Sequence, residues 1–187
     1  MKKTIKLYFE KPVNAEINMD GGQFGAPRNK GRRPHKGLDF KAYLKPVYAS
    51  EKGIVVYSGT REGSVSETNY GETIVIDHAP ELGADNRHIY TLYAHLDKRS
   101  AYRGQRVSKG ETVGISGNSG TVAYYKKLNQ SFHLHFEVID SPTEMDWNGW
   151  SSGNRKNPTD YLDTETTIEY DLSDMVEKSV HSRGHLI

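Results

Sequence analysis

The chain has 187 residues, of which 35% are hydrophobic, and its formal net charge is +1. This length fits one domain with a substantial core. Lysine and arginine are spread along the chain, which argues against a dedicated nucleic-acid binder. No apolar run approaches the ~20 residues of a membrane span, and the lack of cysteine excludes disulfides and cysteine-ligated metal sites.

The beginning of the chain, MKKTIKLYFEKPVNAEIN, has the two lysines of a signal peptide. It does not have the apolar stretch that follows them in such peptides, so no signal peptide is visible. We expect either that a signal has been removed or that the protein leaves its cell by a route that needs none.

Alternation with a period of two, punctuated by glycine, dominates the rest of the chain, and long helical periodicity is scarce. The predicted strands are Pro46–Ala49, Gly53–Tyr57, Glu72–Asp77, His88–Ala94, Glu111–Ser116 and Phe132–Ile139. Short strands at this density predict an all-β fold. Its antiparallel β-sheet core would form either two packed sheets or one partly closed sheet.

Polar and glycine-containing stretches predict loops between and after these strands. They span Gly21–Gly37, Ala79–Arg87, Thr121–Gln130 and Ser141–Asn157. After Tyr161 the chain becomes acidic, and a short helix is predicted around Ser173–Val180.

The last predicted strand contains SFHLHFEV, residues 131–138. Because side chains alternate across a strand, its apolar residues face one side, and His133, His135 and Glu137 face the other. The two imidazoles lie about 6.6 Å apart along the strand. Taken alone, the pattern favours polar residues on a solvated sheet face. Glu137 and Asp77 could orient neighbouring histidines, although exposed strand carboxylates are the commoner case.

A second histidine motif, PHKGLDF, places His35 four residues before Asp39. Pro34 and Gly37 disfavour a helix, so a turn that runs into a strand is the better interpretation. One imidazole and one carboxylate make half of a zinc site, and His135 could supply the third ligand. Such a set leaves the open position that hydrolysis needs, although the same ligands also serve iron or manganese.

A third histidine, His95, ends a predicted strand whose other outward residues include Thr91 and Tyr93. Metal hydrolases need groups that take up and release protons, and an imidazole titrates near neutrality. From its spacing alone, however, His95 is better explained as a histidine that caps a strand end.

Eight stretches of the chain occur in the order found in one known family. They are FGAPR, HKGLDF, PVYASEKGIVVYSG, YGETIVIDH, YTLYAHL, GQRVSKGETVGISGNSG, HLHFEV and NPTDYL. Through them, from about Gly22 to about Asp160, the sequence resembles the M23, or lysostaphin-type, metallopeptidases. These enzymes cleave short peptide bonds in bacterial cell walls.

The resemblance implies a zinc-dependent endopeptidase that hydrolyses stem or cross-bridge peptides of peptidoglycan. It implies that His35, Asp39 and His135 bind Zn²⁺ and that His95 and His133 are the unliganded catalytic histidines. The family's fold is an antiparallel β-sheet core with loops that wall a narrow zinc-containing groove. The implied partners are peptidoglycan peptides, and the implied site of action is extracytoplasmic: the periplasm, the cell wall or a target cell envelope.

Within this resemblance we expect an N-terminal extension over residues 1–21, the peptidase domain over 22–160 and a C-terminal tail over 161–187. The stretch Thr121–Phe132 is longer than in the family, and we expect it to border the cleft and select substrate. The missing signal favours a phage lysin, an interbacterial toxin or a trimmed mature wall hydrolase. A toxin would have an immunity or inhibitor protein as a further partner.

Two other interpretations compete with the enzyme. The first is a non-catalytic relative that acts as a scaffold or activator of other wall hydrolases, but degenerate members typically lack a ligand and here all five positions are filled. The second is a lipoyl-type carrier domain, based on RVSKGETVGISG, which would leave the histidines unexplained. Of the other histidines, His78 is expected at a turn, and His181 and His185 in a solvent-exposed terminus.

Overall fold

The computed structural model describes residues 2–28, 31, 33–61, 70–79, 87–120, 132–147 and 154–171. Its strands are β1 (Lys2–Leu7), β2 (Pro27–Arg28), β3 (Arg33–Pro34), β4 (Leu38–Phe40), β5 (Pro46–Tyr48), β6 (Gly53–Arg61), β7 (Gly71–Asp77), β8 (His88–Arg99), β9 (Arg106–Val107), β10 (Thr112–Ser116), β11 (Leu134–Ser141), β12 (Asn154–Lys156) and β13 (Thr166–Asp171). A 3₁₀ turn, η3 (Pro158–Asp160), follows β12, and Gly120 also has 3₁₀ geometry. The all-β prediction is confirmed.

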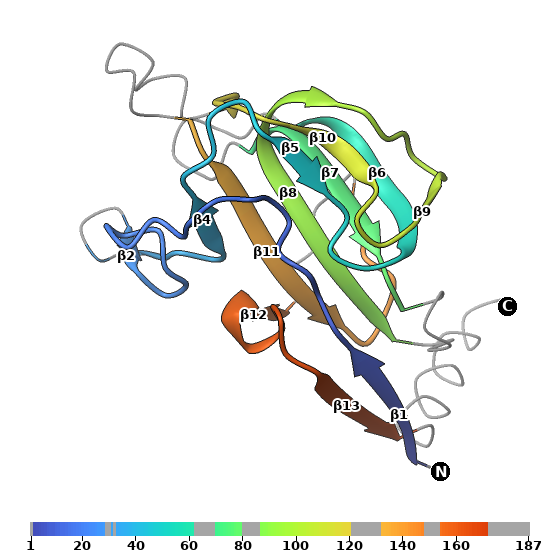
Figure 1. The fold of residues 1–187 in the computed structure, drawn as a ribbon. Helices are drawn as coiled ribbons and strands as arrows, with labels where there is room; N and C mark the ends of the chain where they lie inside the picture. The colour runs from blue at the N-terminus through green and yellow to red at the C-terminus, as the bar shows by residue number, and fades with distance from the viewer. Residues whose placement is uncertain are drawn as a thin grey trace, which may run out of the picture.

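Nine of the strands form one antiparallel sheet (Figure 1). Its order is β12-β11-β8-β7-β6-β9, with β4 added beside β11 and with β10 bridging β8 and β5. The long strands β8 and β11 run side by side through the middle, from the pair His135–Ala94 to the pair Ser141–His88. The six predicted strands all occur within this sheet, with ends that differ by a few residues from the predicted ones.

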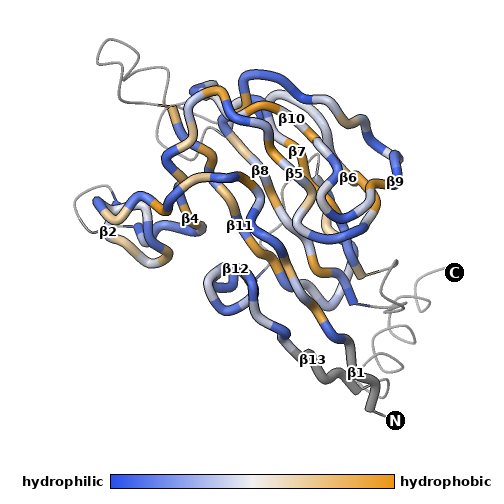
Figure 2. Tube along the Cα trace, in the orientation of Figure 1, coloured by the Kyte–Doolittle hydropathy of each residue, from blue (hydrophilic) through white to orange (hydrophobic). Residues whose placement is uncertain are grey.

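Both faces of the central strands are buried, because alternate side chains belong to two different apolar clusters. The larger cluster includes Ile74, Tyr93, Leu134, Phe136 and Val138. The smaller cluster, on the opposite face, includes Val75, Tyr90, Leu92, Ile139 and Trp147. Figure 2 shows the hydrophobic residues gathered on these inner strands, whereas the surrounding loops are hydrophilic. Burial on both faces agrees with the nearly continuous buried runs of β7 and β8.

The two ends of the described chain meet in a separate ribbon. Strand β1 pairs with β13, with Lys2 opposite Asp171, and Phe9 bridges to Leu162. Phe9 and Leu162 are both part of the larger apolar cluster. Segments on either side of residues 22–160 therefore pack onto the core of that segment, and the predicted domain bounds stay a prediction.

Two predicted segments cannot be compared with the structure. The expected helix at Ser173–Val180 and most of the Thr121–Phe132 stretch lie outside the described residues.

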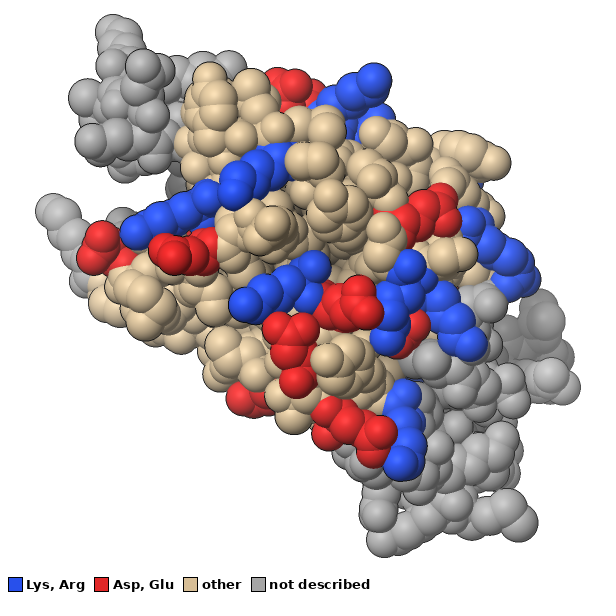
Figure 3. Space-filling model, viewed as in Figure 1, with Lys and Arg blue, Asp and Glu red and all other residues tan. Residues whose placement is uncertain are grey.

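Across the part that is described, no helix has the length and apolar character needed to cross a membrane. On the face shown in Figure 3, acidic and basic side chains are interspersed.

Candidate metal centre

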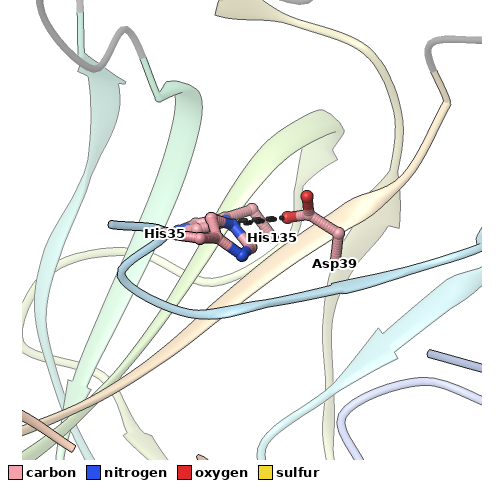
Figure 4. Close-up of side chains that lie close together, drawn as sticks. All are labelled: His35, Asp39 and His135. Atoms are coloured by element: carbon pink, nitrogen blue, oxygen red, sulfur yellow. Dashed lines mark hydrogen bonds and ion pairs between the residues drawn. The ribbon is translucent and has the colours of Figure 1, made fainter. Parts of the chain in front are cut away.

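Three side chains, two from neighbouring strands and one from the turn before β4, converge at one end of the sheet (Figure 4). Asp39 of β4 lies directly opposite His135 of β11 in the antiparallel register, so their side chains meet on one face of the sheet. His35 precedes β4 in the turn after β3 and completes the group. The predicted turn that runs into a strand is confirmed for residues 35–40.

This turn passes very close to β11. A Cβ added to Gly37 would lie 2.2 Å from the carbonyl oxygen of Phe136 and 3.0 Å from Cε1 of His135. A larger residue at this position would push the turn away from the strand. Gly37 therefore lets His35 approach His135.

The three side chains present one atom each to a common point. Nε2 of His35 lies 3.1 Å from Nδ1 of His135, and Oδ1 of Asp39 lies 2.9 Å from Nδ1 of His135 and 3.2 Å from Nε2 of His35. Ligands about 2.0–2.1 Å from a tetrahedral ion would be separated by about 3.3 Å. Two imidazoles and one carboxylate at these separations fit zinc, and they form a cluster that could hold a metal ion.

His35 and Asp39 are also hydrogen-bonded on the side away from the shared point. The backbone carbonyl of Gln23 accepts from Nδ1 of His35 at 2.9 Å, which leaves Nε2 for the metal. Arg28 donates to Oδ2 of Asp39 at 2.7 Å, which leaves Oδ1 for the metal. Gln23 and Arg28 fall in a segment predicted only as a loop, and their sequence carried no signal for these contacts.

The electrostatics of the group favour positive charge. Burial alone would lower the pKa of His135, but its hydrogen bonds with Asp39 and Glu137 outweigh burial and raise that pKa to about 9. Burial likewise opposes ionisation of Asp39, and hydrogen bonds from His135 and His35 nevertheless hold the pKa of Asp39 far below its ordinary value. A pocket that stabilises a carboxylate and a protonated imidazole is suited to a divalent cation, whose binding replaces the proton.

His133 and His95 lie beside the three converging residues. Nε2 of His133 is 3.7 Å from Oδ1 of Asp39, and the ring of His95 is centred 4.7 Å from that of His133 and 5.9 Å from that of His135. His95 donates its Nδ1–H to the carbonyl of Ser119 at 2.8 Å, so its Nε2 can accept a proton. Burial, followed by the charges of the two neighbouring histidines, lowers the pKa of His95 well below its ordinary value and keeps the ring neutral.

His95 reaches this face through a break in the strand. Strict alternation would place it with Tyr93, which is fully buried in the larger apolar cluster on the opposite face. Instead His95 adopts φ = 59°, a conformation that non-glycine residues rarely adopt. Leu96 then takes the place in the larger cluster that alternation would give to residue 95. The prediction that Thr91 and Tyr93 face outward is wrong, because both are fully buried.

The two carboxylates weighed as exposed strand residues are both buried. Glu137 is 0% exposed, and its Oε1 accepts from Nε2 of His135 at 3.0 Å. Asp77 is 4% exposed and pairs at 2.6 Å with Nδ1 of His88, at the other end of β8. The exposed alternative is therefore wrong for both, and only Glu137 contacts one of the converging histidines. The reason is that the segment after β11, with Met145 and Trp147, covers this face of the sheet.

The other histidines lie away from the cluster or outside the described residues. His78 is fully buried and bonds to the carbonyl of Lys52 at 2.8 Å and to the hydroxyl of Thr91 at 2.7 Å. These contacts give it a structural role. The terminal histidines, at positions 181 and 185, lie beyond the described chain.

Comparison with known proteins identifies the family of the chain. The model of peptidase family M23 matches residues 33–147, which is more than half of the chain. A peptidoglycan DD-endopeptidase of Vibrio cholerae, ShyA, is 37% identical over 114 residues, which cover 60% of this chain. The match spans only 22% of that relative's length, so the chain corresponds to about a fifth of it.

Two solved structures share the fold. A zinc-containing peptidase of Vibrio cholerae is 25% identical with a TM-score of 0.53, and the match covers 78% of this chain and 39% of that one. The catalytic domain of lysostaphin from Staphylococcus simulans is 23% identical with a TM-score of 0.54, and the match covers 79% of this chain and 92% of that one. The second likeness supports the fold alone.

Proposed function

The chain belongs to peptidase family M23, and from that premise we propose that it is a zinc-dependent endopeptidase acting on the stem or cross-bridge peptides of peptidoglycan. The observation that carries the proposal is the convergence of His35, Asp39 and His135, with His95 and His133 beside them. A peptidoglycan endopeptidase among its relatives supports the substrate class. The proposed site of action is the cell wall, outside the cytoplasm.

The proposed ligand atoms are Nε2 of His35, Oδ1 of Asp39 and Nδ1 of His135. Zinc bound there would polarise a scissile carbonyl and lower the pKa of water to around 7. Two neutral imidazoles and one carboxylate carry a single negative charge. The site therefore keeps a net positive charge when a divalent cation is bound. Such a site favours the negative charge that develops on a carbonyl oxygen during hydrolysis.

The proposed proton-transfer groups are His95 and His133. The Nε2 atom of His95 can take up a proton because its Nδ1 is committed to the carbonyl of Ser119, and the lowered pKa keeps the ring neutral at physiological pH. Burial to 7% exposure fixes the ring in place. We assign to these two imidazoles the transfer of a proton away from the attacking water and its delivery to the leaving amine.

Digestion of purified cell walls tests the proposal. The zinc-loaded protein is incubated with walls whose cross-bridges differ, and mass spectrometry of the soluble products identifies new peptide termini. We expect cleavage of at least one wall type, loss of cleavage after chelation and recovery when zinc is restored. Tight zinc binding without new termini in any wall type would instead favour the non-catalytic scaffold or activator.

The biological setting is a further part of the proposal. A phage lysin, an interbacterial toxin and a trimmed wall hydrolase would all use the same site. Expression in the periplasm and in the cytoplasm of one host distinguishes an enzyme that acts on the wall from a protein with another target. We expect lysis only on periplasmic expression, and toxicity confined to the cytoplasm would contradict a wall substrate.

A further inference from the structure

Behind His135 lies a group of fully or nearly buried polar side chains, which we call the Glu137 cluster: Glu137, Tyr70 and Arg155. Oε1 of Glu137 accepts from Nε2 of His135 at 3.0 Å and from the Tyr70 hydroxyl at 2.6 Å. Oε2 of Glu137 accepts from Nε of Arg155 at 3.0 Å. Both oxygens of the carboxylate are therefore bonded, and its orientation is fixed from three sides.

Stability alone does not account for a charged group at this place. The surroundings are apolar, since Tyr70 also belongs to the smaller apolar cluster, together with Val75, Leu92 and Ile139. The Glu137 side chain is 0% exposed, and that of Arg155 only 14%. Replacing a buried ion pair by apolar residues is often neutral or stabilising. A sheet that only needed a core would fill this position with another aliphatic residue.

The contact with His135 has a direct chemical consequence. A neutral imidazole carries its proton on one nitrogen, and the other nitrogen has the lone pair that binds a metal. A carboxylate at Nε2 favours the proton there, so Nδ1, which faces Asp39 and His35, is left as the ligand atom. Without Glu137 the proton could move to Nδ1 and remove that lone pair from the site.

Part of the cluster comes from beyond residue 147, where the match to the family model ends. Arg155 lies on β12, where it is paired with Ile139 of β11, and the family match ends at residue 147. Tyr70 lies at the other side, immediately before β7. The strand added after the matched segment therefore supplies the cation that holds Glu137 against the metal site.

We propose that Glu137, clamped by Tyr70 and Arg155, is a positioning residue that orients His135 with Nδ1 toward the metal and thereby sets zinc affinity. This inference rests on the metal site of the proposed function. It goes beyond that proposal because it makes β12 part of the metal centre.

Zinc affinity of the full chain, measured by competition with a chromophoric chelator, tests the inference. For Glu137→Leu we expect affinity to fall about 10- to 100-fold, the usual effect of losing an outer partner of a ligand. For Glu137→Gln the zinc affinity should fall less, because the amide oxygen can still accept from Nε2 of His135. The double change Glu137→Leu/Arg155→Leu removes both members of the ion pair, so that a fold failure caused by an unpaired buried charge does not obscure the result.

Asp140→Asn is the matched control. Asp140 lies on the same strand, is 8% exposed and accepts from Arg87 at 3.0 Å. Its ion-pair partners, Arg87 and Lys156, are not proposed ligands. Its variant should keep the zinc affinity of the wild type. A second readout is the ring ¹⁵N spectrum of zinc-loaded protein, in which we expect the His135 proton on Nε2 in the wild type.

The outcomes separate the two proposals. If the wild type binds no zinc, the proposed metal site fails. If the wild type binds zinc tightly and the Glu137 variants bind it as the Asp140 variant does, the metal site stands and the positioning role of Glu137 is wrong. A His135 proton on Nδ1 in the zinc-loaded wild type would also overturn the inference.

Discussion

Two groups of buried or partly buried histidines occupy opposite ends of the same strand pair, β8 and β11, and they differ in how their nitrogens are used. At one end, His88 pairs with Asp77 at 2.6 Å, and His78 is bonded on both nitrogens. At the other end, His35 and His135 turn one nitrogen each toward a shared point. Burial and a carboxylate partner are common to both ends, so neither identifies a functional histidine. The two ends differ because only at the second do nitrogens of two histidines point to one place.

The carboxylates of the two ends provide the largest expected contrast. Asp39→Asn replaces a proposed carboxylate ligand by a neutral amide, which binds a divalent cation more weakly. We expect zinc affinity to fall by more than the ~10- to 100-fold that is typical when a hydrogen-bond partner of a ligand is lost. Asp77→Asn, at the structural end, should leave zinc affinity unchanged and lower the free energy of unfolding by about 1–3 kcal/mol, because a buried hydrogen-bonded pair is weakened. Chelator competition and urea unfolding measure the two effects. Equal zinc affinities would remove the distinction between the ends.

The second contrast concerns rate. His95→Gln should retain zinc and lose about 10²-fold or more in the rate of wall-peptide hydrolysis, the scale for loss of a proton-transfer group. His88→Gln should keep the wild-type rate, since His88 contacts Asp77 and lies at the start of β8. Turnover of a defined muropeptide, normalised to bound zinc, is the measurement. A wild-type rate in the His95 variant would exclude it from the chemistry.

The smallest expected effect is a pH dependence of stability at the structural end. Burial lowers the pKa of His78 below its ordinary value, against the opposing effect of the Lys52 carbonyl. The unfolded chain therefore takes up the proton first. The stability linked to His78 is fully present above pH ~6.5 and is lost as the pH falls through the lowered folded pKa. In urea unfolding between pH 8 and 5, His78→Gln should show a shallower decline than the wild type, and an identical decline would contradict this assignment.

Much of the sheet could be predicted from the sequence because alternation and glycine placement are local signals. The six predicted strands exist, and the turn from His35 to Asp39 is formed. Alternation identifies the two faces of a strand, however, and not what covers each face. That is why Glu137 and Asp77 were expected to be exposed, whereas the segment with Met145 and Trp147 buries this side of the sheet.

The site was accessible from sequence only in part. The five histidine and aspartate positions followed from family resemblance, and they lie together. The contacts of Arg28 and Arg155 could not be predicted, because they join residues 11 and 18 positions apart whose approach depends on the folded arrangement of the chain. Alternation could not predict which face His95 occupies, since this residue adopts φ = 59° where the register of β8 shifts.

The central claim is that the metal is held by His135 and not by its neighbour His133, although both project from the same stretch of chain. Zinc content and hydrolysis rate, measured side by side on His135→Ala and His133→Ala after circular dichroism has shown both to be folded, test it most directly. We expect His135→Ala to lose zinc and activity together, and His133→Ala to keep one zinc per chain while its rate falls about 10²-fold or more. Loss of zinc from His133→Ala with retention by His135→Ala would reverse the assignment, and activity in both variants would contradict the metallopeptidase itself.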